Sequence, residues 1–257
     1  MRILAVILAR SGSKGVPGKN ARRVCGRPCL EWTIDHALEA KAVGAIDDVV
    51  LSTDGDELAL IASALGVRTI ERPAELATDM ARVDDAARHC LAEYQRGGAG
   101  SWVGDGGVVD AVMILYGNVP VRPAGLLERA STLLRRTGAD SVQSYTPVGK
   151  HHPWWTCVVE SEPEAQVRPW QGDVLNHGVF RRQDLPPAHM PDGGVLLVTS
   201  RALRLEIPGV QPGPHAFFGA DRRGIINPEG SVVDIDSEID LLVADAVLRQ
   251  SPGGVPW

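Results

Sequence analysis

The sequence contains no long apolar run, no excess of basic residues and no closely spaced cysteine pair. Its 257 residues include 26 Lys and Arg against 32 Asp and Glu, which gives a formal net charge of -6. A protein that holds nucleic acid by neutralising phosphates needs a basic face, so this balance argues against a nucleic-acid partner. A local basic loop can still bind a small anion.

The four cysteines are scattered, and the nearest two, Cys25 and Cys29, are too far apart for the Cys-x-x-Cys spacing of redox and zinc sites. We therefore expect reduced thiols and a cytoplasmic protein. The apolar stretch at the amino end is followed directly by Arg10 and Lys14. We expect a buried first strand there, rather than a signal peptide or a membrane span.

Apolar runs of strand length alternate with helical patterns along most of the chain. The expected strands are Ile3–Leu8, Val49–Leu51, Val109–Leu115, Val195–Val198 and Val232–Ile235, and the expected helices are Leu30–Leu38, Leu58–Leu65, Leu126–Leu134 and Glu238–Leu248. This order predicts an α/β fold with a mostly parallel sheet, in which ligands bind at the carboxyl ends of the strands. Ser237 and Asp240 have the spacing of a helix-capping pair. We expect residues 1–257 to form a single domain.

The segment of approximately residues 141–193 departs from this pattern. It is rich in Pro, Trp and His, shows no helical period and is interpreted as a β-rich insertion. Its residues His151, His152, Trp154 and Trp155 suggest a metal or stacking site, but no second set of ligands is visible. A packed contact between two copies of the chain is the better interpretation, because aromatic residues are enriched in interfaces.

A glycine-rich basic loop, residues 8–20, directly follows the first expected strand. Its glycines allow backbone N–H groups to line an anion, and Arg10, Lys14 and Lys19 supply charge-assisted hydrogen bonds. The spacing of Gly12, Gly15 and Gly18 matches neither a P-loop nor the Gly-x-Gly-x-x-Gly dinucleotide fingerprint. The loop therefore indicates a polyphosphate site of another type; the alternative is a solvated basic turn.

Two aspartates, Asp234 and Asp236, are separated by one residue at the end of an expected strand. Alternate residues of a strand point to the same side, so these carboxylates can share a hard cation. Mg²⁺ prefers oxygen ligands and usually keeps waters and substrate phosphates in its coordination sphere. We predict a Mg²⁺ site here; the alternative is that an aspartate only starts the following helix. Asp54 and Asp56, after the second strand, are weaker candidates for a pocket wall.

Four blocks of sequence together resemble the acylneuraminate cytidylyltransferases, which are CMP-sialic acid type enzymes. They are ILARSGSKGVPGKN, LSTDGDELALIASALGV, RPAELATD and DIDSEIDL, and they occur in the family's order over nearly the whole chain. The resemblance implies a Rossmann-like, GT-A-like nucleotidyltransferase domain of three layers with a small inserted dimerisation element. It also implies a homodimer, CTP and magnesium.

The resemblance assigns roles to individual residues of this chain. The nucleotide-binding residues would be Arg10, Ser13, Lys14, Lys19, Asn20 and Arg72, with Asn20 and Arg72 near the ribose and cytosine. The catalytic residues would be Arg10, Lys14, Lys19 and Asp236, and the metal ligands Asp234 and Asp236. The acceptor-binding residues would be Tyr116, Asn118, Arg122 and Arg182. For Arg182, beside Arg181, an ordinary surface charge pair is the alternative.

One stretch departs from the family pattern. Where the family usually has Gln-Pro-Thr-Ser-Pro-Leu-Arg, this chain has Tyr116-Gly117-Asn118-Val119-Pro120-Val121-Arg122. Because that stretch helps to position the acceptor sugar, Tyr116 in place of glutamine affects the identity of the sugar more than the nucleotide chemistry.

The sequence thus predicts an enzyme that transfers CMP from CTP to a nonulosonic keto-sugar acid and releases pyrophosphate. We expect no nucleic acid and no membrane as partners. Two alternatives stay open. One is a related enzyme with another keto-sugar acid or nucleotide, and the other is a non-catalytic relative that only binds nucleotide.

Overall fold

The computed structural model describes residues 1–97 and 108–250. Within them, a seven-stranded sheet has the order β11-β7-β10-β6-β1-β4-β5. Its strands are β1 (Ile3–Leu8), β4 (Asp48–Thr53), β5 (Arg68–Glu71), β6 (Ala111–Tyr116), β7 (Ser141–Pro147), β10 (His189–Thr199) and β11 (Arg222–Ile226). Every strand runs in one direction except β10, which is antiparallel to β6 and β7. The predicted mostly parallel sheet is confirmed.

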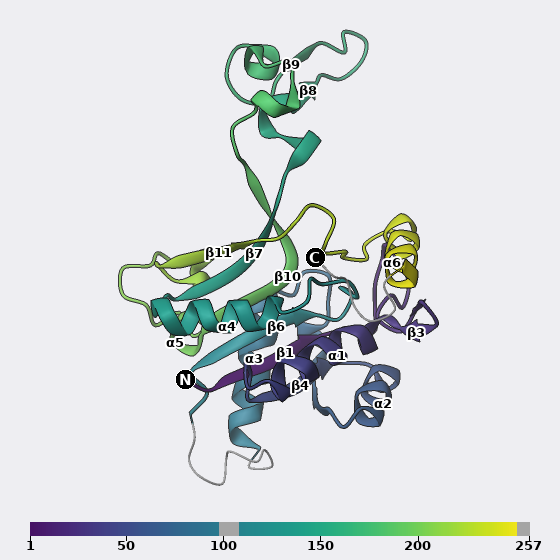
Figure 1. Cartoon of the computed structure of the whole chain (residues 1–257), viewed down its shortest axis with the longest axis vertical. Helices are drawn as coiled ribbons and strands as arrows, with labels where there is room; N and C mark the ends of the chain where they lie inside the picture. Colours follow the sequence, from purple (N-terminus) through teal and green to yellow (C-terminus); the bar gives the residue numbers. More distant parts are fainter. Residues whose placement is uncertain (98–107, 251–257) are drawn as a thin grey trace.

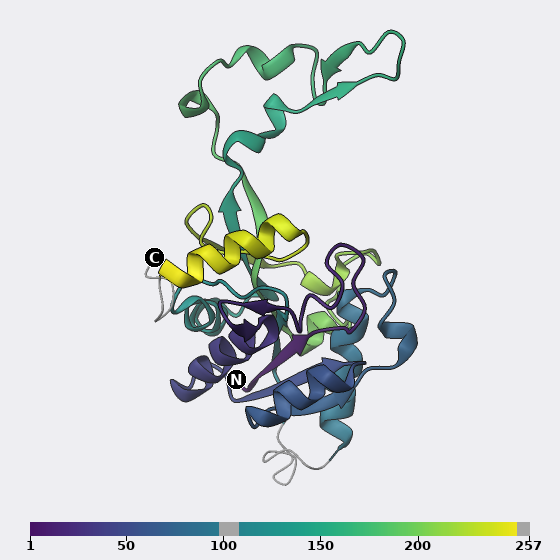
Figure 2. The ribbon, with the colours of Figure 1, turned by 90° about the vertical axis from the view of Figure 1, so that its right-hand side faces the viewer.

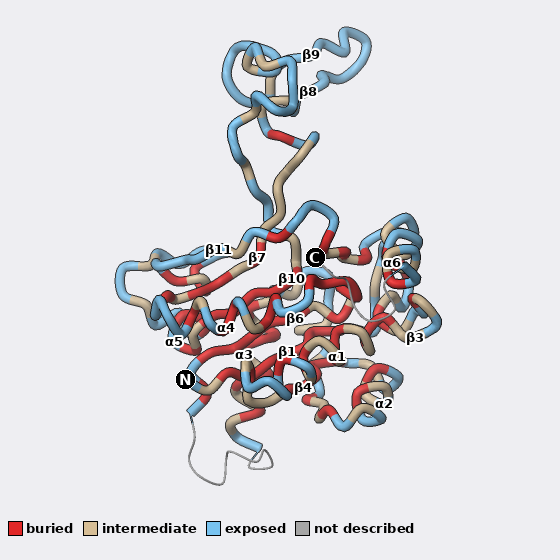
Figure 3. Tube along the Cα trace, viewed as in Figure 1, coloured by how far each residue is buried: buried red, intermediate tan, exposed pale blue. Residues whose placement is uncertain are grey.

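Helices cover both faces of this sheet (Figure 1). They are α1 (Cys29–Ala42), α2 (Asp56–Ala64), α3 (Val83–Arg96), α4 (Leu126–Thr137) and α5 (Ser200–Leu203), and the closing helix is α6 (Glu238–Gln250). The side chains of β1 alternate between two buried clusters, because successive residues of a strand point to opposite faces. Ile3, Ala5 and Ile7 pack with α1, α2 and α4, and the residues between them pack with α3 and α5. Figure 3 shows buried residues concentrated along the sheet, as expected for a three-layer α/β domain.

The closing helix α6 packs on a third, smaller cluster that includes Val16 and Ile235. Its start is capped as predicted: the Ser237 hydroxyl donates to the Asp240 carboxylate at 2.8 Å, and the same carboxylate accepts the Ser237 backbone N–H at 2.7 Å. The expected strand Val232–Ile235 is wrong, since only an isolated bridge joins Val233 to Val121. The chain there runs beside the loop after β6, where the backbone N–H groups of Val233 and Ile235 donate to the carbonyls of Val121 and Asn118.

Between β7 and β10 the chain leaves the sheet as an arm, residues 148–188, which projects from the domain (Figures 1 and 2). It contains the hairpin β8 (Cys157–Val159) and β9 (Val167–Pro169) and the 3-10 helices η3 (Gly149–His151), η4 (Pro153–Trp155), η5 (Leu175–Gly178) and η6 (Arg182–Asp184). The first residues of the expected insertion thus form a strand of the central sheet, and the insertion itself begins after Pro147.

The remaining elements are short. They are β2 (Arg23–Val24), β3 (Arg27–Pro28), η1 (Ala74–Leu76) and η7 (Ala216–Phe218). In residues 1–97 and 108–250, no helix combines the length and the apolar character that a membrane span requires.

Candidate functional site

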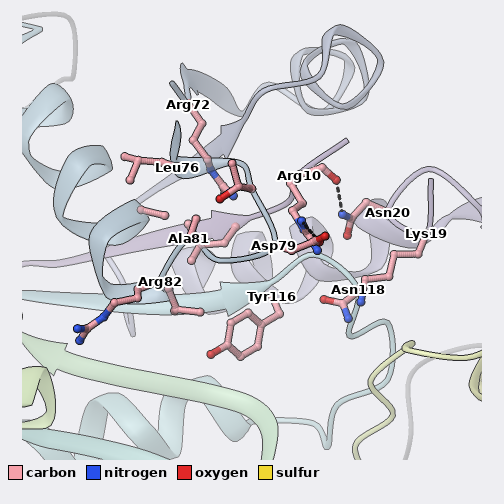
Figure 4. Close-up of a pocket in the computed structure, with 14 residues that line it drawn as sticks. Arg10, Lys19, Asn20, Arg72, Leu76, Asp79, Ala81, Arg82, Tyr116 and Asn118 are labelled. Atoms are coloured by element: carbon pink, nitrogen blue, oxygen red, sulfur yellow. Dashed lines mark hydrogen bonds and ion pairs between the residues drawn. The ribbon is translucent and has the colours of Figure 1, made fainter. Parts of the chain in front are cut away.

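A cavity of about 190 Å³ opens at the carboxyl ends of β1 and β6 (Figure 4). In the sheet, Leu8 at the end of β1 pairs with Tyr116 of β6 on one side and with Ser52 of β4 on the other. The loops after these strands therefore meet at one edge, as parallel strands dictate. The residues that line the cavity include Arg10, Lys19, Asn20, Arg72, Tyr116 and Asn118, all of them predicted from the sequence, together with Leu76, Thr78, Asp79, Ala81 and Arg82.

Two buried side chains form the inner part of this cavity. Asn20 is 4% exposed, and its amide nitrogen donates to the Arg10 carbonyl at 2.9 Å, which leaves the amide oxygen buried without a partner. Gly117 makes this possible, because a Cβ there would lie 2.9 Å from that oxygen and 2.8 Å from the Ala9 Cβ. Arg72 donates to the hydroxyl and carbonyl of Ser52 at 3.1 and 2.7 Å, and burial lowers its pKa. The buried oxygen of Asn20 is therefore available to accept a hydrogen bond from a bound ligand or a water.

The first part of the basic loop is anchored by Asp54, which follows β4. Its carboxylate accepts the Ser11 backbone N–H at 2.8 Å and the Ser11 hydroxyl at 2.7 Å. These hydrogen bonds outweigh burial, which acts in the opposite sense, and lower the pKa of Asp54. Asp54 therefore holds the start of the loop without lining the cavity. Asp56, the first residue of α2, lines a separate groove.

The middle of the loop lies outside the cavity. Lys14 is 85% exposed, Ser13 is half-buried, and neither lines the cavity. The Lys14 ammonium lies 2.7 Å from one oxygen of Asp79, and the Arg10 guanidinium lies 2.6 Å from the other. Asp79 thus brings two of the loop's cations together at the rim of the cavity.

The end of the loop contacts the predicted metal ligands. Lys19 is 15% exposed, and its ammonium lies 2.6 Å from the carboxylate of Asp236. Gly15 approaches the same residue through its backbone, since a Cβ there would lie 2.3 Å from the Asp236 carbonyl oxygen. No side chain fits at Gly15 without moving one of the two segments.

Asp234 lies deeper and contacts Asn118, whose amide nitrogen donates to the Asp234 carboxylate and to the Ile235 carbonyl. Burial, followed by the negative charge of Asp236, raises the pKa of Asp234 to about 6. The described residues contain no group of three or more His, Cys, Asp or Glu placed to hold a metal. Asp234 and Asp236 nevertheless contact two residues that line the cavity, Asn118 and Lys19. This pair of carboxylates fits Mg²⁺, which takes its other ligands from water and phosphate.

The loop after β6 carries the predicted acceptor-binding residues. The side chain of Tyr116 is half-buried beside the cavity, and burial raises its pKa. Arg122 is 2% exposed and lies behind the loop rather than in the cavity, where it donates to the carbonyls of Tyr116, Val119 and Gly194 and to the Thr33 hydroxyl. Burial lowers the pKa of Arg122 to about 10. In this structure Arg122 positions the backbone of the loop.

The last predicted acceptor residue, Arg182, lies on the arm and not at the cavity. Its guanidinium forms an exposed ion pair with Glu229 at 2.7 Å, and neighbouring Arg181 pairs with Asp184 at 2.8 Å. Within the arm, the Trp154 and His177 rings stack with their centroids 4.7 Å apart.

Between β5 and α3, the residues that follow Arg72 were not predicted as site residues. Leu76, Thr78, Asp79 and Ala81 form one wall of the cavity. The block RPAELATD, which contributed to the family resemblance, covers most of this wall. An acidic residue in a basic site is not suggested by phosphate chemistry, so Asp79 had no signal beyond that block.

Comparisons with known proteins agree with this geometry. A family model described as cytidylyltransferase matches residues 4–111. The N-acylneuraminate cytidylyltransferase of Escherichia coli O18:K1:H7 is 39% identical over 97% of this chain and 52% of its own length. The resemblance to the acylneuraminate cytidylyltransferases is confirmed. The chain spans about half the length of this and several other curated N-acylneuraminate cytidylyltransferases that it matches.

A second relative matches along nearly its full length. The CMP-N,N'-diacetyllegionaminic acid synthase of Legionella pneumophila is 28% identical over 97% of both chains. Among solved structures, CMP:2-keto-3-deoxy-manno-octonic acid synthetase complexed with CTP superposes with a TM-score of 0.67 at 15% identity, covering 97% of this chain and 99% of that one. This likeness confirms the predicted α/β fold.

Proposed function

We propose that the chain transfers CMP from CTP to a nonulosonic keto-sugar acid and releases pyrophosphate. The observation that carries the proposal is that the aspartate segment contacts the basic loop that lines the cavity, through the Lys19–Asp236 ion pair and the close approach of Gly15. Cations for a triphosphate and carboxylates for a metal are the two groups that nucleotidyl transfer needs, and here they lie side by side. The cytidylyltransferase relatives support CTP as the nucleotide.

The base and ribose would occupy the inner cavity. The unpartnered oxygen of Asn20 can accept a hydrogen bond from a ribose hydroxyl or a base amino group, and the Arg72 guanidinium can donate to a base carbonyl. The triphosphate would extend along the loop, with Arg10, Lys14 and Lys19 as its charge partners and Ser13 as a hydrogen-bond donor.

In the reaction, the anomeric hydroxyl oxygen of the sugar attacks the α-phosphorus of CTP. A bond forms from that oxygen to phosphorus, the bond to the β-phosphate oxygen breaks, and pyrophosphate leaves with the electron pair while the hydroxyl proton is released. Arg10, Lys14 and Lys19 stabilise the charge that accumulates on the leaving group, so catalysis rests on positioning and electrostatics. Asp234 and Asp236 would hold Mg²⁺, which when bound supplies positive charge to the phosphates.

The acceptor would lie beside Tyr116 and Asn118, in a loop whose Tyr116 and Val119 carbonyls are held by Arg122. A carboxylate-bearing sugar also needs a cation, and Arg182 has the guanidinium for it. Because Arg182 lies on the arm, we propose that two copies of the chain associate through their arms. In this dimer each arm would bring its Arg182 to the acceptor-binding side of a cavity. We also propose that the enzyme works in the cytoplasm.

The test is a screen of CTP, UTP and ATP against a panel of keto-sugar acids, with N,N'-diacetyllegionaminic acid and N-acetylneuraminic acid included. The expected result is a CMP-sugar detected by mass together with stoichiometric pyrophosphate. Formation of a UMP- or AMP-sugar instead would show that UTP or ATP, rather than CTP, is the nucleotide substrate. Nucleotide binding without pyrophosphate release across the whole panel would favour a non-catalytic relative.

A further inference from the structure

Asp79 supplies a carboxylate where the proposed function places phosphate. One of its oxygens lies 2.6 Å from the Arg10 guanidinium and the other 2.7 Å from the Lys14 ammonium. The hydrogen bond from Lys14, followed by the one from Arg10, lowers the pKa of Asp79, so that its side chain stays ionised. In the chain alone, therefore, Asp79 is the anionic partner of two of the loop's three cations, and Asp236 is the partner of the third.

The pairing is not needed to hold the fold together. The side chain of Asp79 is 35% exposed, that of Arg10 30% and that of Lys14 85%, and ion pairs that water reaches contribute little to stability. The loop is fixed elsewhere, by the hydrogen bonds from Ser11 to Asp54 and by the contact of Gly15 with Asp236. Asp79 can thus leave Arg10 and Lys14 without unfolding the loop.

The segment that carries Asp79 is also a wall of the cavity. Leu76 and Ala81 lie on either side of Asp79 in the sequence, and both line the cavity together with Thr78. Figure 4 labels Leu76, Asp79 and Ala81 along this wall. The Ala77 carbonyl accepts a weak hydrogen bond from Arg10 at 3.4 Å. Replacement of the Asp79 carboxylate by phosphate oxygens would therefore affect the wall of the cavity that faces the nucleoside.

We propose that Asp79 is a built-in competitor of the triphosphate. Its carboxylate holds Arg10 and Lys14 until phosphate oxygens replace it, and it pairs with them again when pyrophosphate leaves. This inference rests on the proposed function. A triphosphate carries more negative charge than one carboxylate, so it wins the exchange, but it binds less tightly than it would to free cations. The same exchange weakens the hold on pyrophosphate and favours its release.

The experiment compares the wild type with Asp79→Asn and Asp79→Ala. Calorimetry without sugar measures the dissociation constants of CTP and of inorganic pyrophosphate. We expect both variants to bind both ligands about threefold to tenfold more tightly, which is the range that the loss of two exposed ion pairs allows. In turnover assays, pyrophosphate should inhibit the variants at correspondingly lower concentrations.

Glu75→Gln is the matched control, because Glu75 is an exposed acid four residues earlier in the same segment. Its loss removes the same charge from nearly the same place, and its dissociation constants should stay within twofold of wild type. Equal tightening in Glu75→Gln would reduce the effect to overall charge and overturn the proposal.

The remaining outcomes separate this inference from the proposed function. One contrary result is that the wild type binds CTP and pyrophosphate measurably while both Asp79 variants bind them equally or more weakly. That result would overturn the proposal that Asp79 competes with the triphosphate, and Asp79 would instead be a group that orients Arg10. Tighter pyrophosphate binding by the variants, with no CTP binding by any form, would uphold the anion exchange and reject CTP as the substrate.

Discussion

The Lys19 ammonium lies 2.6 Å from the Asp236 carboxylate, although 217 residues separate the two in the sequence. This ion pair connects the loop after the first strand to the segment before the last helix, and it closes the candidate site between them. Lys19 thereby neutralises part of the acidic pair, which leaves Asp234 as the carboxylate whose charge is least compensated.

Asp236→Asn should lower turnover by roughly 10²-fold or more at saturating Mg²⁺, the size expected when one electrostatic contributor is lost. The amide keeps the volume and can still accept a hydrogen bond from Lys19, so the fold should persist by circular dichroism. Glu238→Gln, which removes an exposed acid at the start of α6, is the control and should keep wild-type turnover. An unchanged rate in Asp236→Asn would remove the metal assignment.

Asp234→Asn should stabilise the protein in the absence of metal and nucleotide. The folded protein raises the pKa of Asp234 from 3.8 to about 6. Between these values the folded state binds more protons than the unfolded state, so this group costs stability as the pH rises and the cost is complete above pH 6. The midpoint of thermal unfolding in EDTA should rise by about 3 °C or more at pH 7.5.

The same variant makes a distinct prediction for pH dependence. The stability advantage of Asp234→Asn should shrink as the pH falls from about 6 towards 3.8, because wild-type Asp234 then becomes neutral as well. Scanning calorimetry across that range measures this. An advantage that is independent of pH would show that charge at Asp234 is not its cause.

Lys14→Ala should lower kcat/KM for CTP by about 10- to 100-fold, because one charge-assisted contact to the triphosphate is lost. Its effect on kcat/KM for the sugar, measured at saturating CTP, should be smaller. Lys41→Ala is the matched control, since Lys41 pairs with Asp48 at the amino end of β4, away from the cavity. If kcat/KM for CTP barely moves in Lys14→Ala, the loop is not the phosphate site.

Tyr116→Gln should shift the ratio of kcat/KM between two keto-sugar acids by about threefold or more, a change of order 1 kcal/mol in one contact. Its dependence on CTP should stay nearly unchanged. The Tyr116 carbonyl is held by Arg122 and Thr33, so the substitution changes the side chain with the backbone fixed. Tyr116→Phe removes the hydroxyl but keeps the ring, so it separates the contributions of the two groups to sugar selection. An unaltered ratio in both variants would place Tyr116 in the core, away from the substrate.

The exposed apolar surface of the arm predicts a homodimer. Phe180 is 91% exposed, Trp170 66% and Val159 62%, a concentration of apolar surface that isolated soluble domains rarely leave open. Light scattering at micromolar concentration should give the mass of a dimer. Phe180→Asp should shift the protein towards monomer, whereas Leu60→Asp, on the exposed face of α2, should not. A monomeric wild type would contradict the arm interface.

Local patterns in the sequence were sufficient for the elements whose cause is local. The buried run Ile3–Leu8 became the central strand β1, and the Ser237–Asp240 spacing capped α6, because alternation and capping depend on a few neighbouring residues. The basic loop could likewise be located at the carboxyl end of β1, since its cations and glycines are adjacent in the chain. The expected strand Val232–Ile235 failed because its β-branched residues pack against the loop after β6, with only Val233 bridged to Val121.

Tertiary structure alone decided which charges meet. The sequence places an arginine at position 122. Only the fold surrounds its guanidinium with the carbonyls of Tyr116, Val119 and Gly194, and these hydrogen bonds make Arg122 a support for the loop. The pairing of Asp79 with Arg10 and Lys14 depends in the same way on how the chain between β5 and α3 returns to the end of β1. Ion pairs and buried hydrogen bonds act over a few ångströms, and only the packing of distant segments sets such separations.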